Sequence, residues 1–339
     1  MFLRPATLDD HAAVLAIAQQ AGFGMTSLPP DAEVLRAKIE ASVKSFAGTY
    51  EKPGQESFFF VLVDADEGEK IVGTCGIKAR IGLTQPFYSY KLTTITQASS
   101  QLDIFSQQTL LQVTNDLTGA TEIGALFLLP SHRRDRMGKM ISLARFMFIA
   151  AHRKYFADTV IAEMRGVHDV SGDAPFYNAL PKKFFQMPFP KADYINATQG
   201  NQFINDLMPK YPIYLSLLPK SARQVVGQVN AASEPAKIML ERQGFKYTGY
   251  IDIFDGGPTL VAPTDQVEVI AKSQRGTITA IEELPEETTK FMISNERFAD
   301  FRCTVGRVEV RAGGTLAITA RLATRIGVKL GDTVRVVGI

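Results

Sequence analysis

The sequence contains no tryptophan, only two cysteines and only four histidines in 339 residues. Cys75 and Cys303 lie far apart, which favours reduced thiols in a cytoplasmic protein over a disulfide framework. The histidines lack cysteine or carboxylate partners at ligand spacing, so we expect no metal site. No apolar run approaches the ~18 residues of a membrane span, and the N-terminus lacks a signal-peptide pattern, so we expect no membrane association.

An excess of charge of either sign is also absent. The formal net charge is +2 and the basic residues are spread along the chain, which argues against a nucleic-acid-binding protein. Neither a Walker loop nor a Rossmann fingerprint occurs. Hydrophobic residues make up 45% of the chain and charged residues 21%, as in an ordinary globular protein, and the length predicts two domains or a duplicated core.

The most informative segment predicts a strand, a basic loop and a helix in succession. The apolar run 126–129 ends at Pro130, and a nearly all-apolar helix follows over residues 140–151. A helix start leaves backbone N–H groups unpaired and carries the positive end of the dipole, which suits a pyrophosphate. A solvated surface turn is an equal alternative for this segment alone. The intervening loop supplies further donors in Arg133, Arg134, Arg136 and Lys139.

A second segment strengthens the phosphate-binding interpretation. Residues 235–245 predict a helix that ends in Gly-Phe, and a strand follows over 246–254. Together the two segments resemble the GNAT superfamily of N-acyltransferases, whose acyl-CoA loop has the form Arg/Gln-x-x-Gly-x-Gly/Ala. Arg133 fits the first position and Gly138 the last, while Arg136 stands where the first glycine usually lies.

Several longer strings resemble one family within these acyltransferases. They occupy residues 26–29, 115–119, 162–166, 207–214 and 250–260. They are similar to the arginine N-succinyltransferase family of bacterial arginine catabolism, including its arginine/ornithine-acting subunits. The resemblance implies succinyl transfer from succinyl-CoA to the α-amine of arginine, or of ornithine. It also implies an α+β, GNAT-like fold with a mixed central sheet, and a homo- or hetero-oligomer.

The pattern of predicted helices and strands divides the chain into a large and a small part. We expect a GNAT-like domain over residues 1–262, interrupted by a helical insertion at about 171–220. The insertion is either a cap or partner surface, or an extension of the core. Residues 88–99 are polar and β-prone, and predict a strand and a loop near the acyl-CoA edge. Residues 263–339 alternate as half-buried strands and predict a small β-rich module with an assembly or stabilising role.

The resemblance also bears on catalytic residues. The proposed proton donor of the family is a histidine in a Gly-Gln-Val-His stretch, and the matching string here ends in Asn230, which cannot carry a proton. Many GNAT enzymes place a tyrosine acid where this chain has Leu240. The strand before the basic loop offers Leu126 and Leu128 to the cofactor, because the family position of Leu126 contacts succinyl-CoA.

Each of the remaining ionisable candidates has two alternative roles. Glu122 either relays a proton from the amine through water or is a solvated charge at a strand end. Glu163 and Arg165 share one face of a strand, and either bind the charges of an amino acid or form an internal ion pair. Asp252 and Asp255 either meet a guanidinium or cap a turn.

We therefore expect an arginine N-succinyltransferase that uses succinyl-CoA as co-substrate. Two alternatives stay open. One is a catalytically weak acyl-CoA-binding subunit of a heteromeric succinyltransferase, which Asn230 favours. The other is a different acyl-CoA:amine N-acyltransferase, because one fold hosts many acyl transfers.

Overall fold

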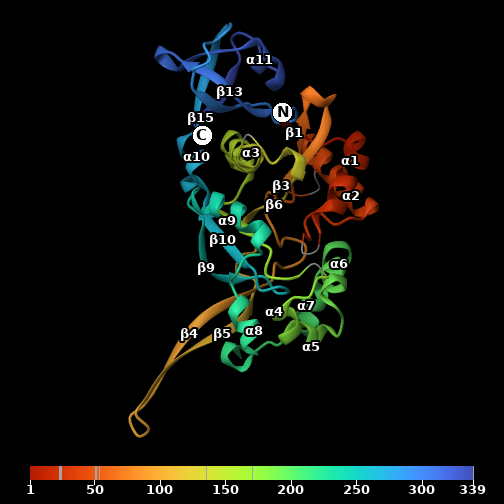
Figure 1. Ribbon diagram of the computed structural model, residues 1–339, viewed down its shortest axis with the longest axis vertical. Helices are drawn as coiled ribbons and strands as arrows, with labels where there is room; N and C mark the ends of the chain where they lie inside the picture. The colour runs from red at the N-terminus through yellow and green to blue at the C-terminus, as the bar shows by residue number, and fades with distance from the viewer. Residues whose placement is uncertain (23–24, 50–51, 53, 135, 170, 339) are drawn as a thin grey trace.

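The computed structural model describes the chain apart from residues 23–24, 50–51, 53, 135, 170 and 339. Its centre is a twisted sheet covered by helices on both faces (Figure 1). The elements that form and cover this sheet are β1 (Phe2–Pro5), α1 (His11–Ala21), α2 (Ala32–Phe46), β2 (Ser57–Asp64), β3 (Lys70–Lys78), β6 (Thr121–Leu128), α3 (Met137–Ala151), β7 (Thr159–Glu163), α9 (Glu234–Glu241), β9 (Lys246–Ile251) and β10 (Pro258–Pro263).

The strand β2 explains why both faces of the sheet are covered. Its run of aromatic and branched residues is buried along nearly its whole length. Successive side chains of a strand point to opposite faces. Phe58 and Phe60 accordingly pack in the core that contains α3, whereas Phe59 and Val61 pack with α1 and α2.

The strands β6 and β7 diverge and leave an opening in the sheet. The central order is β1-β2-β3-β6-β7-β10-β9, and among these neighbours only β6 and β7 run parallel. They pair only at Thr121 with Val160 and at Glu122 with Ile161. Further along β6, the register with β3 shifts and Ala125 adopts a positive φ of 50°. This β-bulge is held by Ser27, whose Oγ accepts a hydrogen bond from the Ala125 N–H at 2.9 Å.

A long hairpin projects from the far end of the sheet (Figure 1). It consists of β4 (Ser89–Ser99) and β5 (Ile104–Thr114), paired over their full length. The strand expected within residues 88–99 is confirmed, but the loop expected there near the acyl-CoA edge was wrong, because β4 continues to Ser99 and leads away from α3. The hairpin tip exposes apolar side chains, with Leu102, Ile104 and Phe105 exposed by 70%, 54% and 72%.

The helical segment between β7 and α9 builds a second hydrophobic core. Phe176 and Tyr177 of this segment pack there with Tyr90 of β4 and Ile251 of β9. The sequence favours short helices here because prolines begin several of them. The elements are α4 (Pro175–Ala179), α5 (Pro181–Phe185), α6 (Phe189–Gln199), α7 (Gln202–Leu207), β8 (Ile213–Tyr214) and α8 (Lys220–Val225).

The C-terminal part is a small five-stranded barrel. Its strand order β12-β15-β11-β14-β13 is closed by a pairing of β12 with β13. The expected mixed α+β fold with a small β-rich C-terminal part is thereby confirmed, while the predicted domain boundary at 262/263 stays a prediction. After α10 (Glu268–Lys272) come β11 (Gln274–Ile281), β12 (Lys290–Asn295), β13 (Cys303–Val310), β14 (Thr315–Ile318), α11 (Ala320–Ile326) and β15 (Thr333–Gly338).

The barrel continues the central sheet. β13 pairs with β1 through Leu3 and Cys303, and Arg321 and Arg325 of α11 form ion pairs with Asp66 at 2.8 and 2.9 Å. Of the helices in the described part of the chain, none is both long and apolar enough to cross a membrane.

Candidate active site

A cavity of about 680 Å³ opens where β6 and β7 separate. Its walls come from residues 122–126, from the end of β7 and from α6, so the helical insertion covers one side of it. Six of the residues that the sequence proposed line this single cavity: Glu122, Leu126, Glu163, Arg165, Asp252 and Asp255.

An ion pair lies at the point of divergence. Lys78 Nζ of β3 is 2.8 Å from Glu122 Oε2 of β6, and the attraction of Glu122 raises the pKa of Lys78. A second lysine, Lys38 of α2, lies beside this pair. Burial, aided by the repulsion of Lys78, lowers the pKa of Lys38 to about 8. Neither lysine was singled out by the sequence, because their proximity to Glu122 arises only when α2, β3 and β6 pack together.

The same cavity holds carboxyl groups that are hard to ionise. Burial raises the pKa of Glu163 well above its usual range, and the negative charges of Asp252 and Glu122 raise it further. Burial together with Asp252 has the same effect on the pKa of Asp255. A cation bound in this cavity would therefore favour ionisation of these groups.

Asp252 and Asp255 also organise the turn after β9. Asp252 Oδ1 accepts hydrogen bonds from the N–H groups of Phe254 and Asp255 at 2.7 and 2.8 Å. Asp255 Oδ2 accepts one from Gly166 N at 2.7 Å, which ties this turn to the segment after β7. The predicted turn-capping role is thus confirmed for both residues. A contact with a substrate would be a second role for either of them.

Asn230 lies beside the cavity rather than among its lining residues. Its backbone N–H donates to Arg165 O at 2.8 Å, and its Oδ1 accepts from Ala232 N at 3.0 Å. Its Nδ2 lies 3.4 Å from His168 O. Arg165 in turn lines the cavity and donates from Nη2 to Ala21 O at 3.2 Å. Asn230 therefore caps a turn that supports Arg165.

The basic loop lies apart from the cavity, at the start of α3. Arg133 Nε donates to Leu128 O at 3.0 Å, and the side chain of Leu128 is buried in the main core. Arg136 has φ 60°, a left-handed conformation that glycine adopts most readily, at the motif position where a glycine usually lies. Apart from the neighbouring backbone of its own helix, a Cβ on Gly138 would meet no atom of the described residues within 4 Å. Arg133, Arg134 and Arg136 are exposed, and Lys139 is half-buried.

Arg145 is a cavity residue that the sequence analysis missed. It lies on α3, is only 2% exposed, and its Nε and Nη2 donate to Ser142 O and Oγ at 3.0 Å. No carboxylate within the described part of the chain forms an ion pair with it, and burial lowers its pKa to about 10. The available signal was the one charged residue within the nearly all-apolar stretch 140–151.

Comparison with known proteins settles the family. Residues 1–269 match the family described as arginine N-succinyltransferase beta subunit, and residues 274–338 match its C-terminal domain. The chain is 38% identical over 345 residues to the arginine N-succinyltransferase of Yersinia pestis (strain Pestoides F), with 100% of this chain and 98% of the relative covered. The chain belongs to the arginine N-succinyltransferase family.

Other members of this family agree with that match. The arginine N-succinyltransferase of Enterobacter sp. (strain 638) is 39% identical over 337 residues, covering 99% of this chain and 97% of that one. The structure of arginine/ornithine succinyltransferase subunit AI from Pseudomonas aeruginosa has a TM-score of 0.89 and 35% identity, covering 99% of this chain and 98% of that one. The resemblance to arginine N-succinyltransferases is confirmed, and with it the expectation of an acyltransferase.

Proposed function

We infer that this chain transfers the succinyl group of succinyl-CoA to the α-amine of L-arginine, as a step of arginine catabolism in the cytoplasm. Family membership over the whole length supports the reaction. The observation that carries it is the cavity at the divergence of β6 and β7, which combines an acidic wall with a buried arginine.

The donor fits between the diverging strands. In this proposal, the pantetheine lies along β6 past Leu126. There β6 no longer pairs with β7, so the backbone N–H and C=O groups at this edge of β6 can bind the ligand. Its pyrophosphate lies against the start of α3, with charge from Arg133, Arg134, Arg136 and Lys139. Gly138 suits this position because open space surrounds it.

Arg145 gives the donor site its preference for a succinyl group. Succinyl carries a terminal carboxylate that acetyl lacks, and a buried guanidinium without an acidic partner is a strong site for such a group. Arg145 lines the cavity and has no ion-pair partner among the described carboxylates. The carboxylate of the donor supplies that missing partner.

The acceptor fits the acidic wall. Arginine carries an α-ammonium and a guanidinium, and Glu122, Glu163, Asp252 and Asp255 supply carboxyl groups for both. Arg165 also lines the cavity and supplies a positive charge that suits the carboxylate of the amino acid. Ornithine has a shorter cationic side chain, so it is the natural acceptor to compare with arginine.

The reaction needs two protons removed from the α-ammonium nitrogen and one oxyanion held. Glu122, paired with Lys78, accepts a proton from the α-ammonium through a water molecule. The amine nitrogen then bonds to the thioester carbonyl carbon, and backbone N–H groups of the bulged strand β6 stabilise the oxyanion. Collapse breaks the C–S bond and releases CoA as a thiolate, since a thiol pKa is about 8.5. The second proton of the nitrogen passes to water, which leaves the neutral amide.

A second candidate function is a catalytically weak subunit that binds acyl-CoA beside an active partner chain. Asn230 favours it, because its side chain is engaged in a turn and cannot supply a proton. The words "beta subunit" and "subunit AI" in the descriptions of the family and of the Pseudomonas aeruginosa relative also fit it. In either case we propose that the hairpin tip with Leu102, Ile104 and Phe105 forms an oligomer contact.

The test is donor selection measured by thiol release. The wild-type chain with arginine is expected to prefer succinyl-CoA over acetyl-CoA, and Arg145→Met is expected to lower kcat/KM for succinyl-CoA roughly ten- to a hundredfold, the loss of one charged hydrogen-bonded contact. Activity with acetyl-CoA should change little, which controls for misfolding. An equal loss with both donors would remove Arg145 from the specificity site, and a wild-type preference for acetyl-CoA would favour a different acyl-CoA:amine N-acyltransferase.

A further inference from the structure

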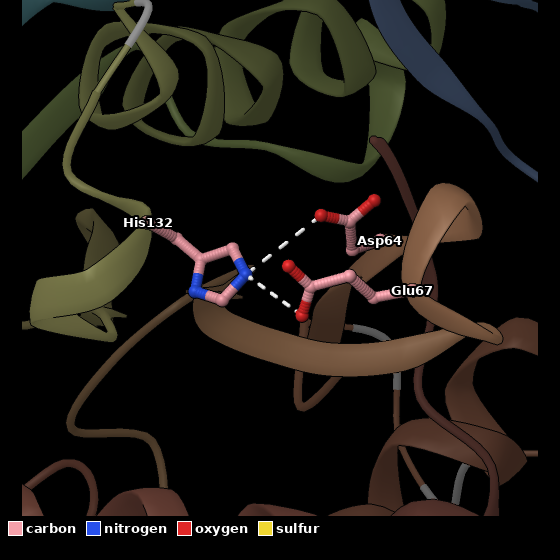
Figure 2. A group of neighbouring side chains, drawn as sticks. All are labelled: Asp64, Glu67 and His132. Atoms are coloured by element: carbon pink, nitrogen blue, oxygen red, sulfur yellow. Dashed lines mark ion pairs between the residues drawn. The ribbon is translucent and has the colours of Figure 1, made fainter.

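Three potential metal ligands meet at a junction outside the cavity. Asp64 ends β2, Glu67 lies in the turn that follows, and His132 lies one residue before Arg133 of the basic loop. One ligand atom of each lies within 4.8 Å of the others, and the ring of His132 points at both carboxylates (Figure 2). The ligands come from segments far apart in the chain, so their spacing in the sequence carried no signal.

The geometry of His132 indicates a missing partner. The residue is only 2% exposed, and its Nε2 makes no hydrogen bond within the described part of the chain. Nε2 lies 3.7 Å from Asp64 Oδ2 and 3.6 Å from Glu67 Oε2, which is too long for hydrogen bonds. Two ligands of one zinc ion, each at about 2.0–2.2 Å, lie about 3.4 Å apart in a tetrahedral site.

The surroundings of the cluster orient its ligands. Ser131 Oγ lies 2.8 Å from His132 Nδ1 and can fix the ring so that Nε2 faces the carboxylates. Asp64 Oδ1 accepts a hydrogen bond from Asp66 N at 3.0 Å, which leaves Oδ2 for a ligand. Two carboxylates balance the charge of a divalent ion, and imidazole selects the zinc class over magnesium or calcium.

We propose that Asp64, Glu67 and His132 bind one divalent transition-metal ion of the zinc class. The ion joins the turn after β2 to the beginning of the basic loop and leaves a fourth position for water. It displaces Lys70, whose Nζ lies 3.4 Å from Glu67 Oε2. The same turn is anchored to the C-terminal barrel through Asp66, so the ion strengthens a junction of three parts of the chain. The expectation of no metal, drawn from the sequence, is the alternative to this site.

The test is a titration of full-length, chelator-treated protein with Zn²⁺ by calorimetry, with the thermal unfolding midpoint as a second readout. We expect one Zn²⁺ per chain and a raised Tm. Glu67→Gln should weaken binding by about a hundredfold or more, since even an outer-shell partner is worth about ten- to a hundredfold. Glu67 is partly exposed, so this variant should fold.

Matched controls lie close by. Glu69→Gln changes an exposed carboxylate next to the same turn and should leave Zn²⁺ affinity unchanged. His132→Gln should abolish binding, whereas His152→Gln, which changes another histidine with an unbonded Nε2, should not. Absence of saturable Zn²⁺ binding by the wild type would overturn the proposal. Equal affinity of wild type and Glu67→Gln, or equal binding of Mg²⁺, would also overturn the proposal.

Discussion

Glu163 lies in a cavity wall without an ion-pair partner in the described part of the chain. Burial and the neighbouring Asp252 and Glu122 raise the pKa of its carboxyl, so this group ionises less readily than the carboxyl of an ordinary glutamate. Lys78 acts in the opposite direction but is held by Glu122. Binding of a cation in the cavity should therefore favour ionisation of the Glu163 carboxyl group.

This behaviour predicts a proton release on arginine binding. A bound ammonium or guanidinium lowers the pKa of Glu163, so arginine should bind more tightly as pH rises through the elevated pKa of the free protein. Calorimetry in two buffers of different ionisation enthalpy measures the released protons, and Glu163→Gln should reduce the release, while Asp255, whose pKa is also raised, can still contribute. Arginine binding with no proton release in the wild type would exclude Glu163 from the acceptor site.

A substitution at Asn230 is predicted to increase enzymatic activity. A positioned general acid contributes about 10²–10⁴-fold, so Asn230→His should raise the turnover of succinyl-CoA with arginine. The gain should shrink as pH rises, because the CoA thiolate then leaves without help. The new side chain must preserve the turn that Asn230 caps, which circular dichroism and Tm can check. If Asn230→His and the wild type turn over at the same rate at every pH, the proton donor lies elsewhere or is not needed.

At the scale of elements, the basic loop and α3 were predictable from the sequence because their signals are local. A proline ends the strand, basic residues fill the loop, and an apolar run forms the helix. The hairpin β4–β5 was only partly predicted, since its polar, β-prone residues give no one-sided burial pattern. The role of Arg145 and the cluster around His132 depend on contacts between distant segments, which local patterns do not encode.

The start of α3 carries a steric prediction. Gly138→Val adds a side chain where, among the described residues beyond the neighbouring helix backbone, no atom lies within 4 Å of the new Cβ, so the variant should fold with an unchanged Tm. The same side chain occupies the space of the pyrophosphate and should sharply weaken the binding of succinyl-CoA. Equilibrium binding of CoA measures the effect, with arginine binding as the control. Normal CoA affinity of the variant would reduce this loop to a surface turn.

At the scale of the whole molecule, the barrel shares a core with the central sheet. Phe298 and Phe301 precede β13, and their rings lie 5.8 and 5.0 Å from that of Phe148 on α3. Aromatic pairs of this kind stabilise beyond their buried area by about 0.5–1.5 kcal/mol each. This packing supports the stabilising role that the sequence suggested for the C-terminal part.

The projecting hairpin predicts self-association or assembly with a partner chain. Its tip is exposed and apolar, so Phe105→Asp should leave the fold and Tm unchanged while it weakens the oligomer. Light scattering coupled to size-exclusion chromatography measures the mass of both proteins, and Asp103→Asn on the same tip is the matched control. An equal mass for wild type and Phe105→Asp would place any oligomer contact elsewhere.

The central claim is succinyl transfer by this chain itself, and analysis of its product tests that claim most directly. The chain, purified without any partner, is incubated with succinyl-CoA and L-arginine, and the product is identified by mass spectrometry and NMR. We predict arginine that carries one succinyl group on its α-nitrogen, formed in a one-to-one ratio with free CoA. Binding of succinyl-CoA without any succinylated arginine would contradict the claim and identify the chain as the acyl-CoA-binding partner of another subunit.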